Sequence, residues 1–228
     1  MSYRLHWFKL APLSSRDVKL LSEGMLRDKY QAERGWGFDI EDVRRDIITG
    51  RFIERESVVD EYADPFGAPQ RFERIVFHQA LFRLDTRWPN MEVTNAPRDL
   101  SAFFSRLGEY TKFQISISPV RKEPAQWIGA LRNAARNVVL EKAVATDITV
   151  TTSITGQVAL SGTEDVEKHL KNFLRQRSYN LDSAQLSFRI NEENLRCEIN
   201  SSGRLRVLYG DPQISTKFFR GVLQELGE

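Results

Sequence analysis

Arginines near the C-terminus alternate with apolar residues, and their side chains could bind phosphate groups. Side chains of a β-strand point alternately to its two faces. Three short strands, expected at about 184–190, 195–200 and 204–209, would therefore each have an apolar and a polar face. The polar face would carry Arg189, Arg196, Arg204 and Arg206 with one acidic residue, Glu198. Because guanidinium groups donate paired hydrogen bonds to phosphate or carboxylate, this pattern predicts a surface for a nucleic-acid backbone or an acidic protein.

Two other interpretations of this polar face remain open. Antiparallel sheets commonly leave one face in water, and the arginines could also pack against the N-terminal part of the chain. The same alternation assigns Tyr209 to the apolar face, so no aromatic side chain is expected among the arginines. Without aromatic rings a sheet cannot stack bases as RNA-recognition sheets do. Contact with nucleic acid is therefore expected at the phosphates rather than at the bases.

A long helix, expected from Glu123 to about Lys142, offers a second basic surface. Its polar side and the residues before it contribute Arg121, Lys122, Arg132, Asn133 and Arg136. Arginine and asparagine have the side chains best shaped to read base edges in a major groove. Arginines at positions i and i+4 repel each other weakly unless an anion neutralises them. The alternative is an ordinary solvated helix face.

Acidic residues crowd the N-terminal third of the chain, and two or three of them could converge on Mg²⁺. They are Asp39, Glu41, Asp42 and Asp46 on an expected helix, and Glu54, Glu56, Asp60, Glu61 and Asp64 on or just after the following strand. Arginines are interleaved with them, so surface ion pairs are the simpler interpretation. We assign no catalytic residue, metal ligand or cofactor, and keep a Mg²⁺-dependent nuclease as an alternative function.

Other catalytic patterns are missing. The single cysteine, Cys197, excludes an intramolecular disulfide and falls on the expected core face of a strand. One cysteine and three histidines leave little material for a zinc site. The segment Gly35-Trp36-Gly37 lacks the residues that complete a phosphate-binding loop, and no Gly-x-Ser-x-Gly motif occurs.

Composition is that of an ordinary globular protein. The 228 residues are 41% hydrophobic and 28% charged, with a net charge of +2. No apolar run approaches the roughly 18 residues of a membrane-spanning helix, and the N-terminus does not resemble a secretory signal. We therefore expect a soluble protein in the cytoplasm.

The expected elements of the N-terminal part combine helices with a long β-hairpin. Apolar periodicity and capping residues predict helices at 15–29, 39–50, 95–107 and 123–142. β-Branched and aromatic residues predict strands at 3–10, 51–62, 71–87 and 112–117. The turn formers of Asp64–Pro69 would close the hairpin between the second and third of these strands.

The C-terminal part is expected to have the order β-α-β-β-β-α. A strand or bent hairpin at 148–160 precedes a helix capped by Thr163, the three short strands and a final helix at 213–226. The fold class expected is α+β, with antiparallel sheets each covered by helices on one face in two closely packed subdomains. These would be residues 1–145, containing the long hairpin, and residues 146–228, joined by the short segment 143–146.

For function, the sequence favours a non-enzymatic binding or scaffolding subunit that contacts a nucleic-acid backbone through arginines. One alternative is a subunit of a larger complex that binds only protein, through exposed aromatic segments such as Trp36-Gly37-Phe38. The other alternative is the nuclease. A protein partner or a homo-oligomer is expected in addition to nucleic acid, and no membrane contact.

Overall fold

The computed structural model describes residues 2–62, 67, 70–175 and 177–227. The chain divides into two compact units. Unit 1 consists of Met1–Lys9 and Ser118–Glu228, and unit 2 of Leu10–Ile117. Two strands, β1 (Tyr3–Ala11) and β6 (Ser116–Pro119), contribute residues to both units. Unit 1 therefore consists of two separate stretches of the chain, and unit 2 consists of the stretch between them.

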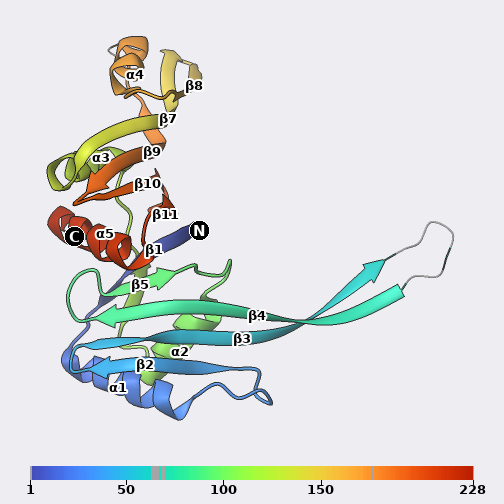
Figure 1. Ribbon diagram of the computed structural model, residues 1–228. Helices are drawn as coiled ribbons and strands as arrows, with labels where there is room; N and C mark the ends of the chain where they lie inside the picture. Colours follow the sequence, from blue (N-terminus) through green and yellow to red (C-terminus); the bar gives the residue numbers. More distant parts are fainter. Residues whose placement is uncertain (1, 63–66, 68–69, 176, 228) are drawn as a thin grey trace. The chain divides into compact units, whose positions relative to one another are not determined.

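Unit 2 packs two helices against one face of its strands (Figure 1). Its elements are α1 (Ser15–Arg27), β2 (Trp36–Arg44), β3 (Ile47–Tyr62), β4 (Gln70–Asp85), β5 (Met91–Thr94) and α2 (Ser101–Tyr110). Helix α1 begins at a capping box, in which the Ser14 hydroxyl accepts the Asp17 N–H and the Asp17 carboxylate accepts the Ser14 N–H. Its buried stripe of Val18, Leu21 and Met25 has the i, i+3, i+4 spacing of an amphipathic helix.

The core of unit 2 is aromatic. Phe103 of α2 lies with its ring centre 5.1 Å from that of Phe82 and 5.6 Å from that of Phe52. Phe38 of β2 joins this cluster, with its ring centre 5.1 Å from that of Phe52. Offset and tilted aromatic pairs at these separations are favourable beyond the apolar area that they bury. This cluster fixes α2 on the face that β2, β3 and β4 share.

Strands β3 and β4 pair along their whole length, from Ile47↔Asp85 to Tyr62↔Gln70, which confirms the predicted hairpin. β2 pairs only with the part of β3 up to Glu54, and β5 only with Leu81–Leu84 of β4. Residues 55–62 and 70–80 therefore form a two-stranded ribbon, which we call the arm (Figure 1). The predicted turn at Asp64–Pro69 lies, apart from Gly67, outside the described residues.

Unit 1 is a second layered structure, in which α3 and α5 lie on one face of the strands (Figure 1). Its elements are α3 (Pro124–Ala134), β7 (Arg136–Thr151), β8 (Ile154–Ser161), α4 (Glu167–Leu174), β9 (Asn180–Ile190), β10 (Glu193–Asn200), β11 (Leu205–Tyr209) and α5 (Pro212–Leu226). Phe219 of α5 packs edge-on to Phe188 of β9 and to Trp127 of α3. The strands predicted at 184–190, 195–200 and 204–209 and the helix predicted at 213–226 are confirmed as β9, β10, β11 and α5.

The strands form one sheet rather than separate ones, so the expected fold class is wrong. Their order is β2-β3-β4-β5-β1-β11-β10-β9-β7-β8, with β6 paired to β1. In the described part of the chain the fold is a mostly antiparallel 11-stranded sheet, with 49% of residues in strands and 26% in helices. The position of β1 explains the error, because this first strand stands between β5 and β11 in the order. Periodicity along a sequence shows that a strand exists but not which strands are its neighbours.

Two predicted helices are also wrong. Residues 39–50 belong to β2, β3 and the turn between them, and Ile48, like Phe38 just before this segment, is a buried strand residue. The helix predicted over 123–142 ends at Ala134, and β7 follows. Asn137 there has a φ of 53°, which helix interiors do not contain, and the β-branched Val138 and Val139 favour a strand.

The segment expected to link two subdomains, residues 143–146, lies inside β7. The division into 1–145 and 146–228 stays a prediction. None of the described helices is long and apolar enough to cross a bilayer.

Candidate nucleic-acid interface

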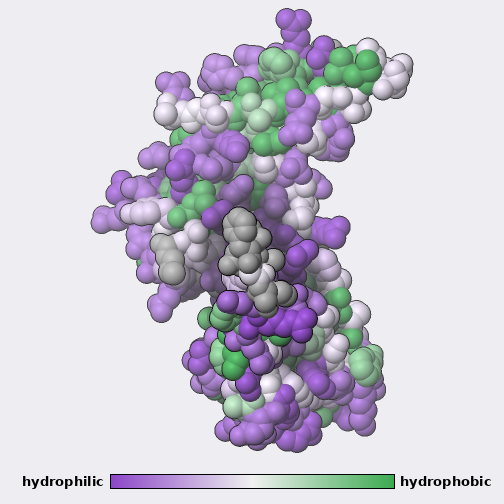
Figure 2. Space-filling model, turned by 90° about the vertical axis from the view of Figure 1, so that its right-hand side faces the viewer, coloured by the Kyte–Doolittle hydropathy of each residue, from purple (hydrophilic) through white to green (hydrophobic). Residues whose placement is uncertain are grey.

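The strands of unit 1 have one apolar and one polar face. Inward-facing residues of β9, β10 and β11 are buried beneath the helices, as the alternation predicts: Leu186, Phe188, Leu195, Cys197, Ile199, Leu205 and Val207. The opposite face, which we call the arginine face, carries Arg4, Arg136, Arg189, Arg196, Arg204 and Arg206 together with Glu141 and Glu198. All six arginines are exposed. Figure 2 shows hydrophilic residues over much of the visible surface.

Arg136 and Arg189 form a like-charged pair on this face. They are directly opposite each other in the pairing of β7 with β9. Neither has a hydrogen-bond or ion-pair partner for its side chain among the described residues. Like charges directly opposite in a sheet destabilise it. An external anion between the two guanidinium groups would remove this repulsion.

A second pair of like charges lies where β1 meets β11. Arg206 is opposite Arg4 on one side and opposite Glu198 of β10 on the other. Its guanidinium group donates a long, 3.4 Å hydrogen bond to the Ser2 hydroxyl. Sequence reasoning missed Arg4, because nothing in the pattern of residues 3–10 indicates that this strand pairs with β11.

Arg196 is engaged within the protein. Its Nε donates to a carboxylate oxygen of Glu141 on β7 at 2.6 Å. Partial burial raises the pKa of Glu141, but hydrogen bonds from Gln185, Ser187 and Arg196 outweigh this and hold the pKa below its usual value. Arg196 is therefore the least available of the four arginines that the sequence indicated in β9–β11.

His6 lies near Arg204 and Arg4 of the arginine face and stays neutral. Burial, followed by the positive charges of Arg204 and Arg4, lowers its pKa to about 4. Its Nε2 is buried and has no hydrogen-bond partner among the described residues. At neutral pH this imidazole adds no charge to the arginine face.

Tyr209 is an aromatic residue beside the arginines, and the sequence alternation assigns it wrongly to the core. The register of β10 against β11 shifts between Arg196 and Cys197, so Tyr209 pairs with Arg196 while Cys197 pairs with Val207. A bulge of this kind redirects the residues beyond it. Tyr209 is 66% exposed, so its ring is accessible for stacking.

The basic residues predicted around a long helix are not all brought together. Arg132 on α3 forms salt bridges to Asp165 at 3.2 Å and to Glu167 at 2.5 Å, which attaches α3 to α4. Asn133 is exposed near the end of α3. Because the helix ends before Arg136, the argument from two arginines on successive turns no longer applies.

Arg121 and Lys122 precede α3 and lie outside any helix or strand. The Cα of Arg121 is 3.1 Å from where a Cβ on Gly203 would stand. Arg121 therefore adjoins the turn that leads into Arg204.

The N-terminal carboxylates mostly have partners within the protein. Asp39 pairs with Arg51 at 2.7 Å, and Asp42 with Arg44 at 2.8 Å. On the arm, Glu61 pairs with Arg71 at 2.6 Å. Asp64 lies outside the described residues. Among the residues described, no group of three His, Cys, Asp or Glu side chains could hold a metal ion, so the nuclease hypothesis has no geometric support there.

The aromatic segment Trp36-Gly37-Phe38 is largely packed. Phe38 is 1% exposed. The guanidinium groups of Arg34 and Arg106 lie over the Trp36 ring, 4.3 and 3.9 Å from its centre, a cation–π arrangement that holds the start of β2.

Comparison with other proteins gives no functional indication, since no protein-family model and no curated protein matches this chain.

Proposed function

We propose that this protein is a non-enzymatic subunit that binds the backbone of a nucleic acid through the arginine face. The observation that carries this proposal is the pair Arg136 and Arg189, which are opposite each other, exposed and without an ion-pair partner in the described part of the chain. Phosphate groups provide closely spaced anions that would neutralise such a pair.

The extent of the face also suits a polymer. Arg204 and Arg189 are two strands apart across the sheet and about six residues apart along it, which gives a separation of roughly 20 Å. Six arginines and two glutamates occupy this area. A surface of this length and charge fits several successive phosphates better than it fits one small anion.

Salt-dependent binding tests the proposal. The change Arg136→Ala/Arg189→Ala should weaken binding of a single-stranded oligonucleotide by 10- to 100-fold at about 0.1 M salt, because two phosphate contacts are lost. The slope of log K against log salt should fall in magnitude by about 1.4. Fluorescence anisotropy with the full chain at several salt concentrations measures both.

The matched control is Arg98→Ala/Arg177→Ala, which removes two exposed arginines outside the arginine face. It should leave the slope unchanged. Binding that survives the first double change, or that both changes weaken equally, would contradict the proposal.

Tyr209 gives a second prediction, specific to single strands. The change Tyr209→Ala should reduce affinity for a single-stranded oligonucleotide by roughly 5- to 150-fold, because stacking of a base on an aromatic ring contributes about 1–3 kcal/mol. Tyr209→Phe keeps the ring and should bind like the unchanged protein. Duplex affinity should be the same for all three, since paired bases are already stacked. Equal losses from Ala and Phe would show that the ring does not stack.

Exposed apolar side chains on the arm support the alternative function, a subunit that binds only protein. Several large apolar side chains on the arm are more than half exposed: Val59, Tyr62, Phe72 and Phe77. Two-stranded ribbons are marginally stable alone in water, so a protein that covers these side chains would stabilise the arm. A protein partner or homo-oligomer and a cytoplasmic location belong to the proposal in either case.

A further inference from the structure

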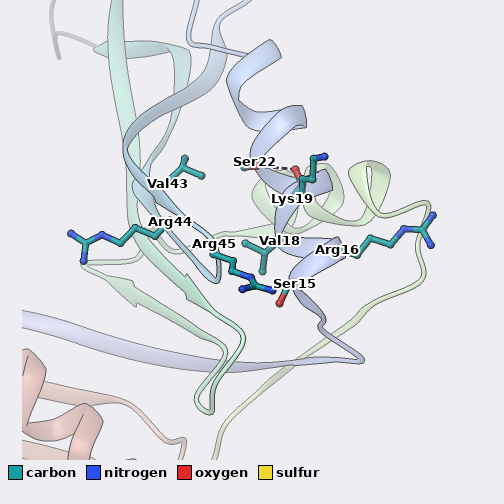
Figure 3. A pocket seen from close by; sticks show the side chains of 8 residues that line it. All are labelled: Ser15, Arg16, Val18, Lys19, Ser22, Val43, Arg44 and Arg45. Atoms are coloured by element: carbon teal, nitrogen blue, oxygen red, sulfur yellow. Dashed lines mark hydrogen bonds between the residues drawn. The ribbon is translucent and has the colours of Figure 1, made fainter.

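A groove in unit 2 lies between α1 and the end of the β2–β3 hairpin. It has a volume of about 470 Å³. Its lining consists of Ser15, Arg16, Val18, Lys19, Ser22, Val43, Arg44 and Arg45. Figure 3 shows Val43 on the strand side, Lys19 and Ser22 on the helix side, and Arg45 reaching toward Ser15. The groove is thus bounded by a helix and by a strand.

The strand at this groove is an edge of the sheet, because β2 stands first in the strand order. The beginning of its outer edge is occupied: Phe38 donates its N–H to Asp28 and accepts the N–H of Tyr30, each at 3.0 Å. Beyond Ile40, no described strand pairs with β2 on that side. An edge of this kind presents N–H and C=O groups to which an extended chain can add as a further strand.

The side chains of the groove combine apolar and positive character. Val18 is buried and Val43 is 42% exposed, so the two form an apolar floor that is partly open to solvent. Arg16 and Arg45 have no side-chain hydrogen bond or ion pair with any described residue. Figure 3 shows Arg16 and Arg44 extending to opposite sides of the groove. A ligand lying along the groove would meet cations at several points.

Four acidic residues near the groove have partners among the described residues. Asp17 is engaged by Ser14 in the capping box, and Asp46 accepts a hydrogen bond from the Ser15 hydroxyl at 2.6 Å. Lys19 lies 3.9 Å from Glu23 and Arg44 lies 2.8 Å from Asp42. Both pairs are largely exposed, and exposed pairs contribute little energy. Lys19 and Arg44 can therefore leave these partners and bind carboxylates of a ligand instead, at a small cost in free energy.

We propose that this groove binds an extended, acidic peptide segment of a partner protein, which adds as a strand to β2. Alternate side chains of such a strand point to opposite sides. Aliphatic side chains on one side would contact Val18 and Val43, while carboxylates would bind Arg16, Arg45 and Lys19. A nucleic acid matches the charge but has no backbone amide pattern to pair with the strand edge, so a peptide fits both features.

Peptide titration tests this proposal. The probe is a labelled octapeptide that alternates glutamate with valine, and its binding to the full chain is followed by anisotropy at about 50 mM salt. We expect saturable binding with a Kd of roughly 10–300 μM, because a short segment buries less area than a standard protein interface and loses conformational freedom when it is ordered. Two further versions carry N-methylated valines or N-methylated glutamates, so that each lacks one alternate set of N–H donors. If a strand is added, the version whose methylated set faces β2 should bind at least 5-fold more weakly.

Charge reversal separates this groove from non-specific attraction. Arg16→Glu/Arg45→Glu should weaken the glutamate peptide at least 10-fold and allow a lysine–valine octapeptide to bind. The control Arg98→Glu/Lys112→Glu changes the net charge equally and should alter neither affinity by more than about 2-fold, since screened charges elsewhere act weakly. Circular dichroism checks that both variants stay folded.

Three results would overturn the proposal. They are the absence of saturable binding up to about 1 mM peptide, equal binding of the unmodified peptide and both N-methylated peptides, and displacement of the peptide by an oligonucleotide of equal charge. The last result would assign the groove to nucleic acid instead.

Discussion

Replacing Phe103 with alanine is expected to lower the free energy of unfolding by about 3–5 kcal/mol. Phe103 is 1% exposed, and its ring contacts those of Phe38, Phe52 and Phe82. Alanine would remove the ring from the centre of this cluster, and rigid strands on one side prevent the surrounding rings from closing the cavity. Urea unfolding followed by circular dichroism measures the loss.

The neighbouring Phe104 provides the control. It is the same residue type on the same helix but is only partly buried, so Phe104→Ala should cost about 1 kcal/mol. If the two changes destabilise the protein equally, the aromatic cluster is not the core that holds α2 on the sheet. The change Phe103→Leu keeps most of the side-chain volume, so it should lower the free energy of unfolding by only about half as much as Phe103→Ala.

Local structure could be predicted well where sequence pattern and sheet burial coincide. The β3–β4 hairpin follows from two runs of β-branched and aromatic residues, and the faces of β9–β11 follow from strict alternation. Apolar periodicity and a serine cap predicted α1, and the structure shows that the helix begins at a capping box of Ser14 and Asp17. In these places local preference and tertiary structure agree.

Capping residues misled the prediction where no buried helical stripe accompanied them. Asp39 and Asp42 look like residues of a first helical turn, but in β2 they are exposed or half-exposed strand residues that pair with Arg51 and Arg44. Burial of Phe38 against the aromatic cluster decides the conformation there. Tertiary packing overrides the weak preference of a segment for a helix when only its capping residues favour one.

The arrangement of the arginine face depends on strand neighbours, which the sequence does not show. Alternation places Arg189, Arg196, Arg204 and Arg206 on one face, but only the pairing of β7 with β9 adds Arg136 and Glu141, and only that of β1 with β11 adds Arg4. Tyr209 depends on a bulge, which has no local signal here. Whether this face binds nucleic acid stays a prediction.

The change Asp85→Ala is the second substitution with a large expected effect, a loss of about 2–3 kcal/mol in the free energy of unfolding. Asp85 ends β4 and is 4% exposed. Its carboxylate accepts hydrogen bonds from Arg83 at 2.8 Å and from the backbone and side chain of Arg87 at 3.0–3.2 Å. The Nε of Arg83 is already buried without a partner among the described residues. Removing the carboxylate would leave a largely buried cation uncompensated, which costs more than the pair contributes.

The effect of pH distinguishes this ion pair from simple packing. Burial raises the pKa of Asp85, but hydrogen bonds from Arg87 and the charges of Arg87 and Arg83 outweigh it, so the pKa lies below its ordinary value of 3.8. A carboxylate with a lowered pKa in the folded state stabilises the protein above the unfolded value, and this stabilisation is lost as pH falls through the folded value. The difference in unfolding free energy between the unchanged protein and Asp85→Asn should therefore be constant from about pH 5 to 7 and shrink below about pH 4. Glu33→Gln, at an exposed position with no partner in the described chain, should show no such difference at any of these pH values. A difference for Asp85→Asn that stays the same down to pH 2 would mean that shape, and not charge, holds the end of β4.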